Sequence, residues 1–316
     1  VIVYEQDAHI SILVGAAAAA LLGVFVLGYT WEELEKGIIE SIGSVMQAIL
    51  ILAIIGMLIG TWIAGGVVPT LIYYGLQILS PSFFLITALL ICSVVSIATG
   101  SSWTTAGTVG VALIGIATGL GISVPLAAGC IVSGAYFGDK MSPLSDTTNL
   151  APAMAGSTLF DHIRHMFYTT GLSYGITAVI FIIIGFRYRG QELNATEIQG
   201  ILDAIQSIYT INPLFLLVPV VTIGAVALKV PAIPGLLIGV ILGGFCMIFQ
   251  GGDLGSILDA VQNGVVAESG HEMVDSLLSG GGMQSMMNTI SLIMCALTFG
   301  GILEVTGMMA CIAGKM

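Results

Sequence analysis

Charged and amide side chains gather in one short run of a chain that is otherwise largely apolar. Asp139, Lys140, Asp146 and Asn149 stand there, although 57% of all residues are apolar and only 8% are charged. An ionised side chain at the centre of a bilayer costs roughly 3 kcal/mol or more, so a carboxylate kept there is functional by default. The same run supplies neutral hydroxyl oxygens, at Ser142, Ser145, Thr147 and Thr148. We therefore expect a binding site here.

The backbone around these residues carries two helix breakers. Gly138 precedes the charges and Pro143 follows the first two of them. Because proline removes a backbone donor and clashes with the preceding turn, we predict an interrupted transmembrane helix over 122–153. The break should lie between Asp139 and Asn149, at membrane depth, where only protein or a water-filled cavity can surround unwound backbone. A structural alternative is a buried aspartate–lysine pair that holds the break in shape.

A second group of hydroxyls interrupts the apolar pattern of segment 97–120. Its members are Thr99, Ser101, Ser102, Thr104 and Thr105. Neither flank of the interruption is long enough to cross a bilayer cleanly, so we expect a re-entrant hairpin over 97–120 with these hydroxyls at its tip, facing the break. The alternative is an ordinary helix whose Ser and Thr hydroxyls bond to carbonyls of the preceding turn.

The overall composition indicates an all-α, polytopic membrane protein, because soluble domains carry about a quarter charged residues. The formal net charge of −11 argues against a nucleic-acid partner, since basic stripes are absent. The five cysteines lie scattered in apolar runs without a CxxC pair, which favours small buried hydrophobes. Only seven Lys and Arg residues are present, so the sequence predicts no orientation in the membrane.

Shorter patterns predict how some helices begin and pack. Thr30 with Glu33 three residues later is a capping-box pattern, and the helix that it starts should run uninterrupted to about Ala64. Small residues at a spacing of four let helices approach closely. The second half of the chain carries such a series, namely Gly235, Gly239 and Gly243.

Two parts of the chain have similar sequence patterns. The run Gly43–Gln47 before a long apolar helix resembles Gly281–Gln284 before another, which indicates internal repeats. We predict a first transmembrane repeat over 1–186, a polar connector over 187–212 and an incomplete, inverted second repeat over 213–316. Repeats of this kind underlie many secondary transporters, whose sites lie at broken helices near the bilayer midplane.

The second repeat lacks a counterpart of the hydroxyl-rich tip and of the break. We therefore expect the chain to be a piece of a longer protein, truncated at both ends, which also fits its start at Val1 rather than at a methionine. Such a piece should not transport by itself, because half of the expected cavity wall is missing.

Two long motifs carry a resemblance to a known family. The sequence strongly resembles the NhaC family of Na+/H+ antiporters at residues 98–105 (ATGSSWTT) and 134–152 (GAYFGDKMSPLSDTTNLAP). Runs 56–64 (GMLIGTWIA) and 160–165 (FDHIRH) fit the same family. The resemblance covers nearly the whole chain. It implies a larger group of ion transporters in which each repeat contributes a re-entrant hairpin and an interrupted helix.

The resemblance implies a secondary transporter, not an enzyme, that exchanges Na+ for H+ across a bacterial cell membrane. Na+ is a hard cation, which carboxylate, hydroxyl and carbonyl oxygens suit. We expect Asp146 first, and Asp139 second, to bind Na+ or a proton in turn, with Lys140 as the counter-charge of one carboxylate when the ion is absent. Asn149 and both groups of hydroxyls would supply neutral oxygens. The expected partners are Na+, H+ and membrane lipid, with a homodimer also considered, and no resident cofactor is expected.

Two other functions stay open at this point. Family members also exchange H+ or Na+ for organic anions such as malate and lactate. Such a substrate needs a cationic partner, for which the chain offers Lys140 and Arg164, or the N-termini of helices. An intramembrane hydrolase that uses Ser or His with Asp is the remoter alternative, because neither GxSxG nor HExxH is present.

Overall fold

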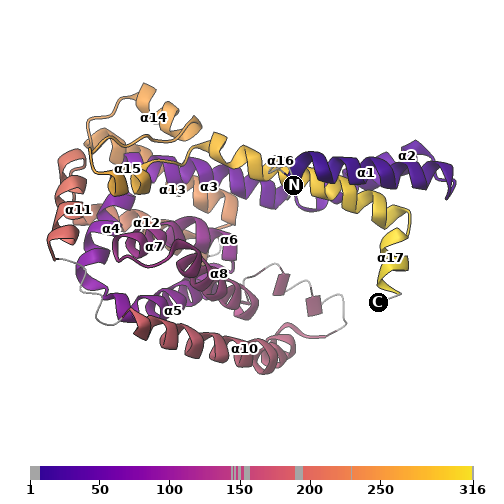
Figure 1. Ribbon diagram of the computed structural model, residues 1–316, viewed down its shortest axis with the longest axis horizontal. Coiled ribbons are helices and arrows are strands. Elements are labelled where there is room, and N and C mark those ends of the chain that lie inside the picture. Colours follow the sequence, from indigo (N-terminus) through magenta and orange to yellow (C-terminus); the bar gives the residue numbers. More distant parts are fainter. Residues whose placement is uncertain are drawn as a thin grey trace. The chain divides into compact units, whose positions relative to one another are not determined.

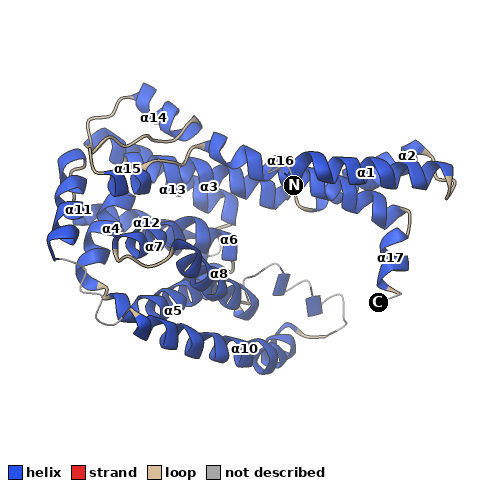
Figure 2. Cartoon of the chain, viewed as in Figure 1, coloured by secondary structure: helices blue, strands red, loops and turns tan. Residues whose placement is uncertain are grey.

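The computed structural model describes residues 8–143, 145, 147–148, 151–152, 157–188, 195–228 and 230–314. Within this part the regular structure is helical (Figure 1, Figure 2), apart from one isolated antiparallel bridge between Val265 and Gly280. The chain divides into two compact units, one of Val1–Ala53 with Met286–Met316 and one of Ile54–Ser285.

The first unit consists mainly of three helices. It contains α1 (Ala8–Phe25), α2 (Trp31–Ser44) and most of α16 (Met283–Val305), with the start of α3 (Met46–Ala64) and the short α17 (Met308–Ala313). Apolar side chains from α1, α2 and α16 form a small core that holds these three helices together. Its fully buried members are Ala16, Ala19, Leu34 and Ile302.

The start of α2 confirms the predicted capping box. The Thr30 hydroxyl accepts from the Glu33 amide at 3.3 Å, and the Thr30 amide donates to the Glu33 carboxylate at 2.8 Å. The Thr30 amide and hydroxyl both donate to the Glu33 carboxylate. These two bonds favour its charged form, so they hold the pKa of Glu33 below its ordinary value. The predicted uninterrupted helix to Ala64 is wrong, because Val45 (φ −112°, ψ 10°) separates α2 from α3. Gly43 just before it is a poor helix former.

The second unit holds the end of α3 and the helices that follow it. These are α4 (Val67–Ile78), α5 (Pro81–Thr99), α6 (Ser102–Thr105), the π-helix η1 (Ala106–Gly110), α7 (Val111–Gly119), α8 (Val124–Met141), α10 (Leu159–Arg187), α11 (Ala195–Ile208), the 3₁₀ turn η2 (Pro213–Leu216), α12 (Leu217–Ala227), α13 (Ala232–Phe249), α14 (Leu254–Gln262) and α15 (Glu272–Leu278). Because α6, η1 and α7 follow one another directly, they form one helical run over 102–119.

Six described helices are long and apolar enough to cross a membrane, namely α1, α3, α5, α10, α13 and α16. A seventh span results if Gln199–Ile208 and Pro213–Ala227, which meet at a bend of 92°, count as one. The apolar stretch of α10 is only 11% buried by protein, and it leaves side chains such as Phe167 and Leu172 exposed. Lipid is the natural solvent for such a surface. The prediction of an all-α, polytopic membrane protein is confirmed, and the inverted repeat stays a prediction.

The predicted polar connector over 187–212 contains a helix that the sequence analysis missed. Helix α11 packs on α4 and α15. Its buried face consists of Ile201, Leu202 and Ile205. Exposed Asp203 and Gln206 made the segment look polar, although every third or fourth position is apolar, which is the pattern of a half-buried helix.

The glycine series of α13 packs as predicted. A β-carbon at Gly239 would lie 2.9 Å from Leu58 of α3, and one at Gly243 would lie 2.8 Å from Thr61. The indole nitrogen of buried Trp62 also donates to the Gly239 carbonyl oxygen at 3.0 Å. Since the residue numbers rise together along this contact, α3 and α13 run parallel.

Candidate functional site

Helices α5 and α8 form the scaffold of the candidate site, and they also run parallel. At one end the Cys130 thiol donates to the Leu85 carbonyl, and at the other end the Ser142 hydroxyl donates to the Ile97 carbonyl, each at 2.7 Å. Between them the buried Ser96 hydroxyl donates to the Ala135 carbonyl at 2.5 Å. The parallel arrangement places the C-terminal ends of both helices at the same end of the pair.

Two glycines allow this close approach. A β-carbon at Gly134 would collide with the Leu89 carbonyl oxygen of α5. One at Gly138 would lie 2.5 Å from the Ser93 carbonyl oxygen and 2.8 Å from the Ile97 amide nitrogen. Because backbone atoms cannot move aside as a side chain can, only glycine fits at these positions.

The chain reverses at the tip that the hydroxyls predicted. Gly100 adopts the left-handed conformation (φ 68°) at the end of α5. Ser101 then caps α6, since its side chain accepts from the Thr104 amide at 3.2 Å. The run over 102–119 returns along the pair, because α8 must start near the beginning of α5 to run parallel to it. Whether this reversal lies inside the membrane stays a prediction.

The reversal brings Ser102 to Asp139, the central contact of the site. The Ser102 hydroxyl donates to the Asp139 carboxylate at 2.9 Å, although the two residues are 37 positions apart. Asp139 is half-buried. Lys140 points elsewhere, with its ammonium nitrogen 4.9 Å from the centroid of the Tyr136 ring. Within the described part of the chain, no cationic side chain forms an ion pair with Asp139.

Helix ends add to the electrostatics of this place. The C-terminal ends of α5 and α8 carry negative partial charge, and both lie beside Asp139. The positive N-terminal end of the 102–119 run meets the carboxylate itself through Ser102. The carboxylate is thereby oriented but not neutralised by a charge. Such an arrangement favours a bound cation.

The break in the helix begins just after Asp139 rather than at Asp139 itself. Helix α8 continues to Met141, and Ser142 is extended (φ −83°, ψ 127°). The predicted break between Asp139 and Asn149 is therefore corrected: in the described residues it begins at Ser142. The physical cause is Pro143, which pushes the preceding residue out of the helical region, whereas Gly138 serves the contact with α5.

The residues after the break fold back onto the end of α8. The Thr148 hydroxyl donates to the Asp139 carbonyl oxygen at 3.0 Å. The Ser145 hydroxyl lies 3.0 Å from that of Thr147 and accepts from the Thr148 amide at 3.4 Å. Ser142, Ser145 and Thr148 are buried. Four of the predicted neutral oxygens thus gather at the end of the helix that carries Asp139.

The remaining predicted site residues either bond within their own helical turn or lie outside the described residues. The buried Thr104 and Thr105 hydroxyls donate to Ser101 within their own turn, at 3.1 Å and 3.0 Å, as in the ordinary-helix alternative. Their role as ligands stays a prediction. Asp146, Asn149 and the side chain of Thr99 lie outside the described residues. The expected pairing of Lys140 with a carboxylate is absent for Asp139.

Sequence reasoning missed two serines of α5 that shape the site. Ser93 lies against Gly138, and Ser96 bonds to α8. The signal was present, because Ser93 and Ser96 are three apart and share one face of an otherwise apolar helix. Facing glycines four apart, Gly134 and Gly138, complete that pattern. It becomes readable only once the two helices are known to be partners.

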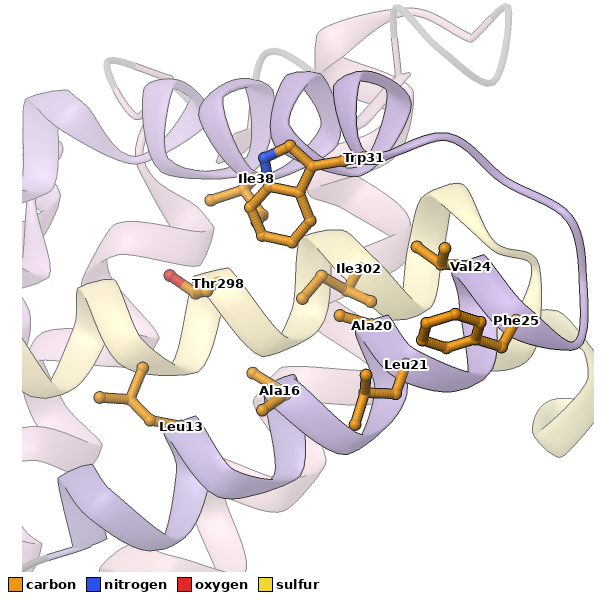
Figure 3. Close-up of a pocket in the computed structure, with 11 residues that line it drawn as sticks. Leu13, Ala16, Ala20, Leu21, Val24, Phe25, Trp31, Ile38, Thr298 and Ile302 are labelled. Atoms are coloured by element: carbon orange, nitrogen blue, oxygen red, sulfur yellow. The ribbon is translucent and has the colours of Figure 1, made fainter.

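The structure also contains an apolar groove of about 510 Å³ in the first unit (Figure 3). It lies between α1, α2 and α16, and Thr298 contributes the one hydroxyl among its eleven lining residues. No ionisable side chain lines it, so it does not compete as an ion site. In the described part of the chain, no three His, Cys, Asp or Glu side chains gather to hold a metal ion.

Comparison with known proteins identifies relatives of this chain. The sequence model of the Na+/H+ antiporter family matches residues 134–315. The Na+/H+ antiporter NhaC of Alkalihalophilus pseudofirmus is 44% identical over 96% of this chain and 66% of its own length. The malate-2H+/Na+-lactate antiporter of Bacillus subtilis is 42% identical over 95% of this chain and 64% of its own length.

A third relative widens the range of named substrates. The arginine/ornithine antiporter ArcD of Halobacterium salinarum is 39% identical over 99% of this chain and 65% of its own length. The chain therefore spans about two thirds of the length of these relatives. All three are named antiporters, which are transporters rather than enzymes. No solved structure matches the chain.

Proposed function

The chain belongs to the Na+/H+ antiporter family, and we propose that the complete protein exchanges Na+ for H+ at the carboxylates of Asp146 and Asp139 with the help of neighbouring neutral oxygens. One observation carries this proposal: the Asp139 carboxylate is held by the Ser102 hydroxyl while Lys140 lies over Tyr136. A carboxylate without a described cationic partner, in a chain of transmembrane helices, has room for a transported cation.

The exchange follows from competition for one negative charge. A carboxylate can hold Na+ or a proton, but the two ions exclude each other, because either one neutralises the charge that attracts the other. Neutral oxygens stabilise Na+ more than a proton, since a hard cation takes several oxygen ligands at once. The hydroxyls of Ser102 and Thr147 and the carbonyls at the ends of α5 and α8 supply such oxygens. The cation therefore displaces the proton when Na+ is abundant.

We retain Asp146 as the first candidate for this role and Asp139 as the second. Asp146 stands among the densest oxygens of the sequence, and the fold brings its neighbours Ser145, Thr147 and Thr148 back to the end of α8. If both aspartates share the ion, both carboxylates take part in each exchange. More than one proton per Na+ then becomes available for exchange.

A coupled exchange of organic ions is the second candidate, and the names of two relatives favour it. One relative is named for malate and lactate, and another for arginine and ornithine. An anionic substrate would need Lys140 to leave the Tyr136 ring, or the N-terminal end of the 102–119 run to receive a carboxylate. A cationic substrate could use Asp139 directly. The intramembrane hydrolase receives no support, because the relatives are named antiporters.

Exchange assays on the protein expressed from the complete gene test the proposal. Reconstituted vesicles would receive Na+, Li+, malate, lactate or arginine in turn, and internal pH would report proton movement. We expect Na+-driven proton flux that is lost in Asp146→Asn and strongly reduced in Asp139→Asn. Asp203→Asn is the control, because exposed Asp203 bonds only to Gln199 on α11.

The two variants also divide the role between the aspartates. Near-normal exchange in Asp146→Asn with inactive Asp139→Asn assigns the shared ion to Asp139. Normal exchange in both removes the site from this region. Flux driven by an organic ion but not by Na+ alone replaces the first function by the second.

A further inference from the structure

Tyr174 is a polar side chain near the middle of α10, a helix many of whose apolar side chains are exposed. The side chain is half-buried. A tyrosine hydroxyl far from water needs a hydrogen-bond partner, because an unsatisfied polar group in an apolar medium costs free energy. The partner comes from α5 rather than from α10 itself.

The hydroxyl of Tyr174 lies 2.8 Å from that of Ser93. Ser93 donates its own proton to the Leu89 carbonyl at 2.7 Å, so Tyr174 is the donor in the shared bond. The ring of Tyr174 stacks on that of Phe137 of α8, with centroids 3.8 Å apart and planes 20° from parallel. One side chain thus joins α10 to both helices of the site.

This junction lies next to the residue that precedes Asp139. The Ser93 carbonyl oxygen is the atom that a β-carbon at Gly138 would meet at 2.5 Å. Phe137, Gly138 and Asp139 are consecutive, and each faces a different neighbour: Tyr174, α5 and Ser102. Successive helical residues point about 100° apart, so the direction of Asp139 depends on how α8 is rotated about its axis. Glycine offers no side chain to interlock, so the rotation depends on the hydrogen bonds of Ser96 and Ser142 together with the stacked rings of Phe137 and Tyr174.

We propose that Tyr174 is a positioning residue that sets the rotation of the last turns of α8 and so delivers the Asp139 carboxylate to Ser102. This inference rests on the proposed exchange at Asp139. Tyr174 acts from outside the site: its ring blocks rotation of Phe137 in one direction, and its hydroxyl fixes the ring to Ser93. Loosening it misplaces the carboxylate and weakens ion binding, while the helices stay assembled.

Tyr174→Phe is the principal variant, because it keeps the stacked ring and removes only the hydroxyl. In vesicles that contain the protein from the complete gene, we expect the Na+ concentration for half-maximal exchange to rise about threefold to tenfold, the effect of one lost hydrogen bond. The maximal rate should stay within about twofold, since the chemistry of the carboxylate is unchanged. Ser93→Ala removes the same bond from the other side and should give the same shift. Tyr168→Phe is the matched control, because Tyr168 lies exposed on the same helix.

A double-mutant cycle separates positioning from mere packing. In a protein that already carries Ser102→Ala, Tyr174→Phe should raise the half-maximal Na+ concentration little further, because the bond between Ser102 and Asp139 that Tyr174 aligns is already absent. The inference is overturned if the double variant shows the product of the two single shifts. It is also overturned if Tyr174→Phe leaves the half-maximal Na+ concentration unchanged or lowers only the maximal rate. Asp139→Asn keeps the two proposals apart. If that variant exchanges normally, Asp139 is not part of the site and the premise of this inference fails; if its exchange is strongly reduced while Tyr174→Phe behaves as the wild type, only the role of Tyr174 fails.

Discussion

Two pairs of parallel helices in the second unit use the same packing device for different ends. Glycines four apart let α8 approach α5, at Gly134 and Gly138, and let α13 approach α3, at Gly239 and Gly243. In each pair a buried side chain also donates to a carbonyl across the contact. Yet only the first pair carries ionisable residues.

The atoms that face the glycines differ between the two pairs. At Gly138 the nearest α5 atom is a backbone oxygen, whereas at Gly239 the nearest atoms are side-chain ends of Leu58 and Thr222. Helix α13 continues to Phe249, but α8 ends at Met141 and leaves carbonyls that serine and threonine hydroxyls must satisfy. Close glycine packing therefore occurs in both pairs, and the candidate site lies where one of the packed helices ends.

The largest expected difference concerns the glycines. Gly138→Ala should reduce Na+-driven proton flux at least tenfold, because overpacking against backbone costs about 1–3 kcal/mol and displaces the neighbouring Asp139. Gly239→Ala should leave the flux within about twofold, because it meets side-chain atoms that can move. Gly129→Ala on α8 is the control, since nothing lies within 4 Å of its added β-carbon. Equal losses at 138 and 239 would show that the two contacts are equivalent.

Removing the hydrogen bond at the carboxylate should have the next largest effect. Ser102→Ala should raise the Na+ concentration for half-maximal exchange about tenfold, because a bond to a charged group contributes about 1.5 kcal/mol. Ser133→Ala is the control on α8, since the Ser133 hydroxyl donates only within its own helix, to the Gly129 carbonyl. A Ser102→Ala protein with wild-type affinity would mean that the 2.9 Å contact is not part of the ion site.

Removing single hydrogen bonds between the paired helices should distinguish effects on stability from effects on Na+ affinity. Ser142→Ala and Trp62→Phe each remove one bond to a carbonyl of the partner helix, so each should lower the free energy of unfolding by about 1 kcal/mol or more. Only Ser142→Ala should also weaken Na+ binding, by about twofold to fivefold. Thermal denaturation in detergent, measured with and without Na+, reads both quantities. If Trp62→Phe also reduced the stabilisation that Na+ gives in thermal denaturation, the ion site would have to include α3.

Acid should have the smallest effect, and between the two helix pairs it should act on the side of α3. The loop before α16 lies against Gly60 of α3, whose added β-carbon would be 2.9 Å from the Gly282 amide nitrogen. Helix α15 precedes that loop, and its Asp275 accepts from the Ser269 amide and hydroxyl, each at 2.6 Å; these bonds hold the pKa of Asp275 below its ordinary 3.8.

A carboxyl whose pKa is lowered by folding stabilises the fold above its unfolded value and loses that contribution as pH falls through the folded value. The protection of amides 265–280 against hydrogen exchange, taken relative to their intrinsic exchange rates at each pH, should therefore stay constant above about pH 5 and decrease below about pH 4. Asp275→Asn should remove this pH dependence of protection. Protection that already decreases near neutral pH would point to another group.

The sequence could predict the outline of the site because its signals are local. Pro143 forbids a continuing helix, Gly100 and Ser101 interrupt an apolar run, and Asp139 is costly in a membrane; each statement needs only neighbouring residues. The capping box at Thr30 succeeded for the same reason. Where local signals conflicted, the prediction failed: Gly138 was taken as a helix breaker, although its contact with Ser93 keeps it inside α8.

By itself, the sequence determined that this is an all-α membrane protein, and it predicted which residues carry the chemistry. The tertiary structure decided which of those residues meet. It made α5 and α8 parallel, which brings two helix ends and Ser102 to Asp139, and it turned Lys140 toward Tyr136. The reason is physical: composition and local breaks act on nearby residues, whereas the pairing of helices depends on how glycines and serines far apart in the chain fit against each other.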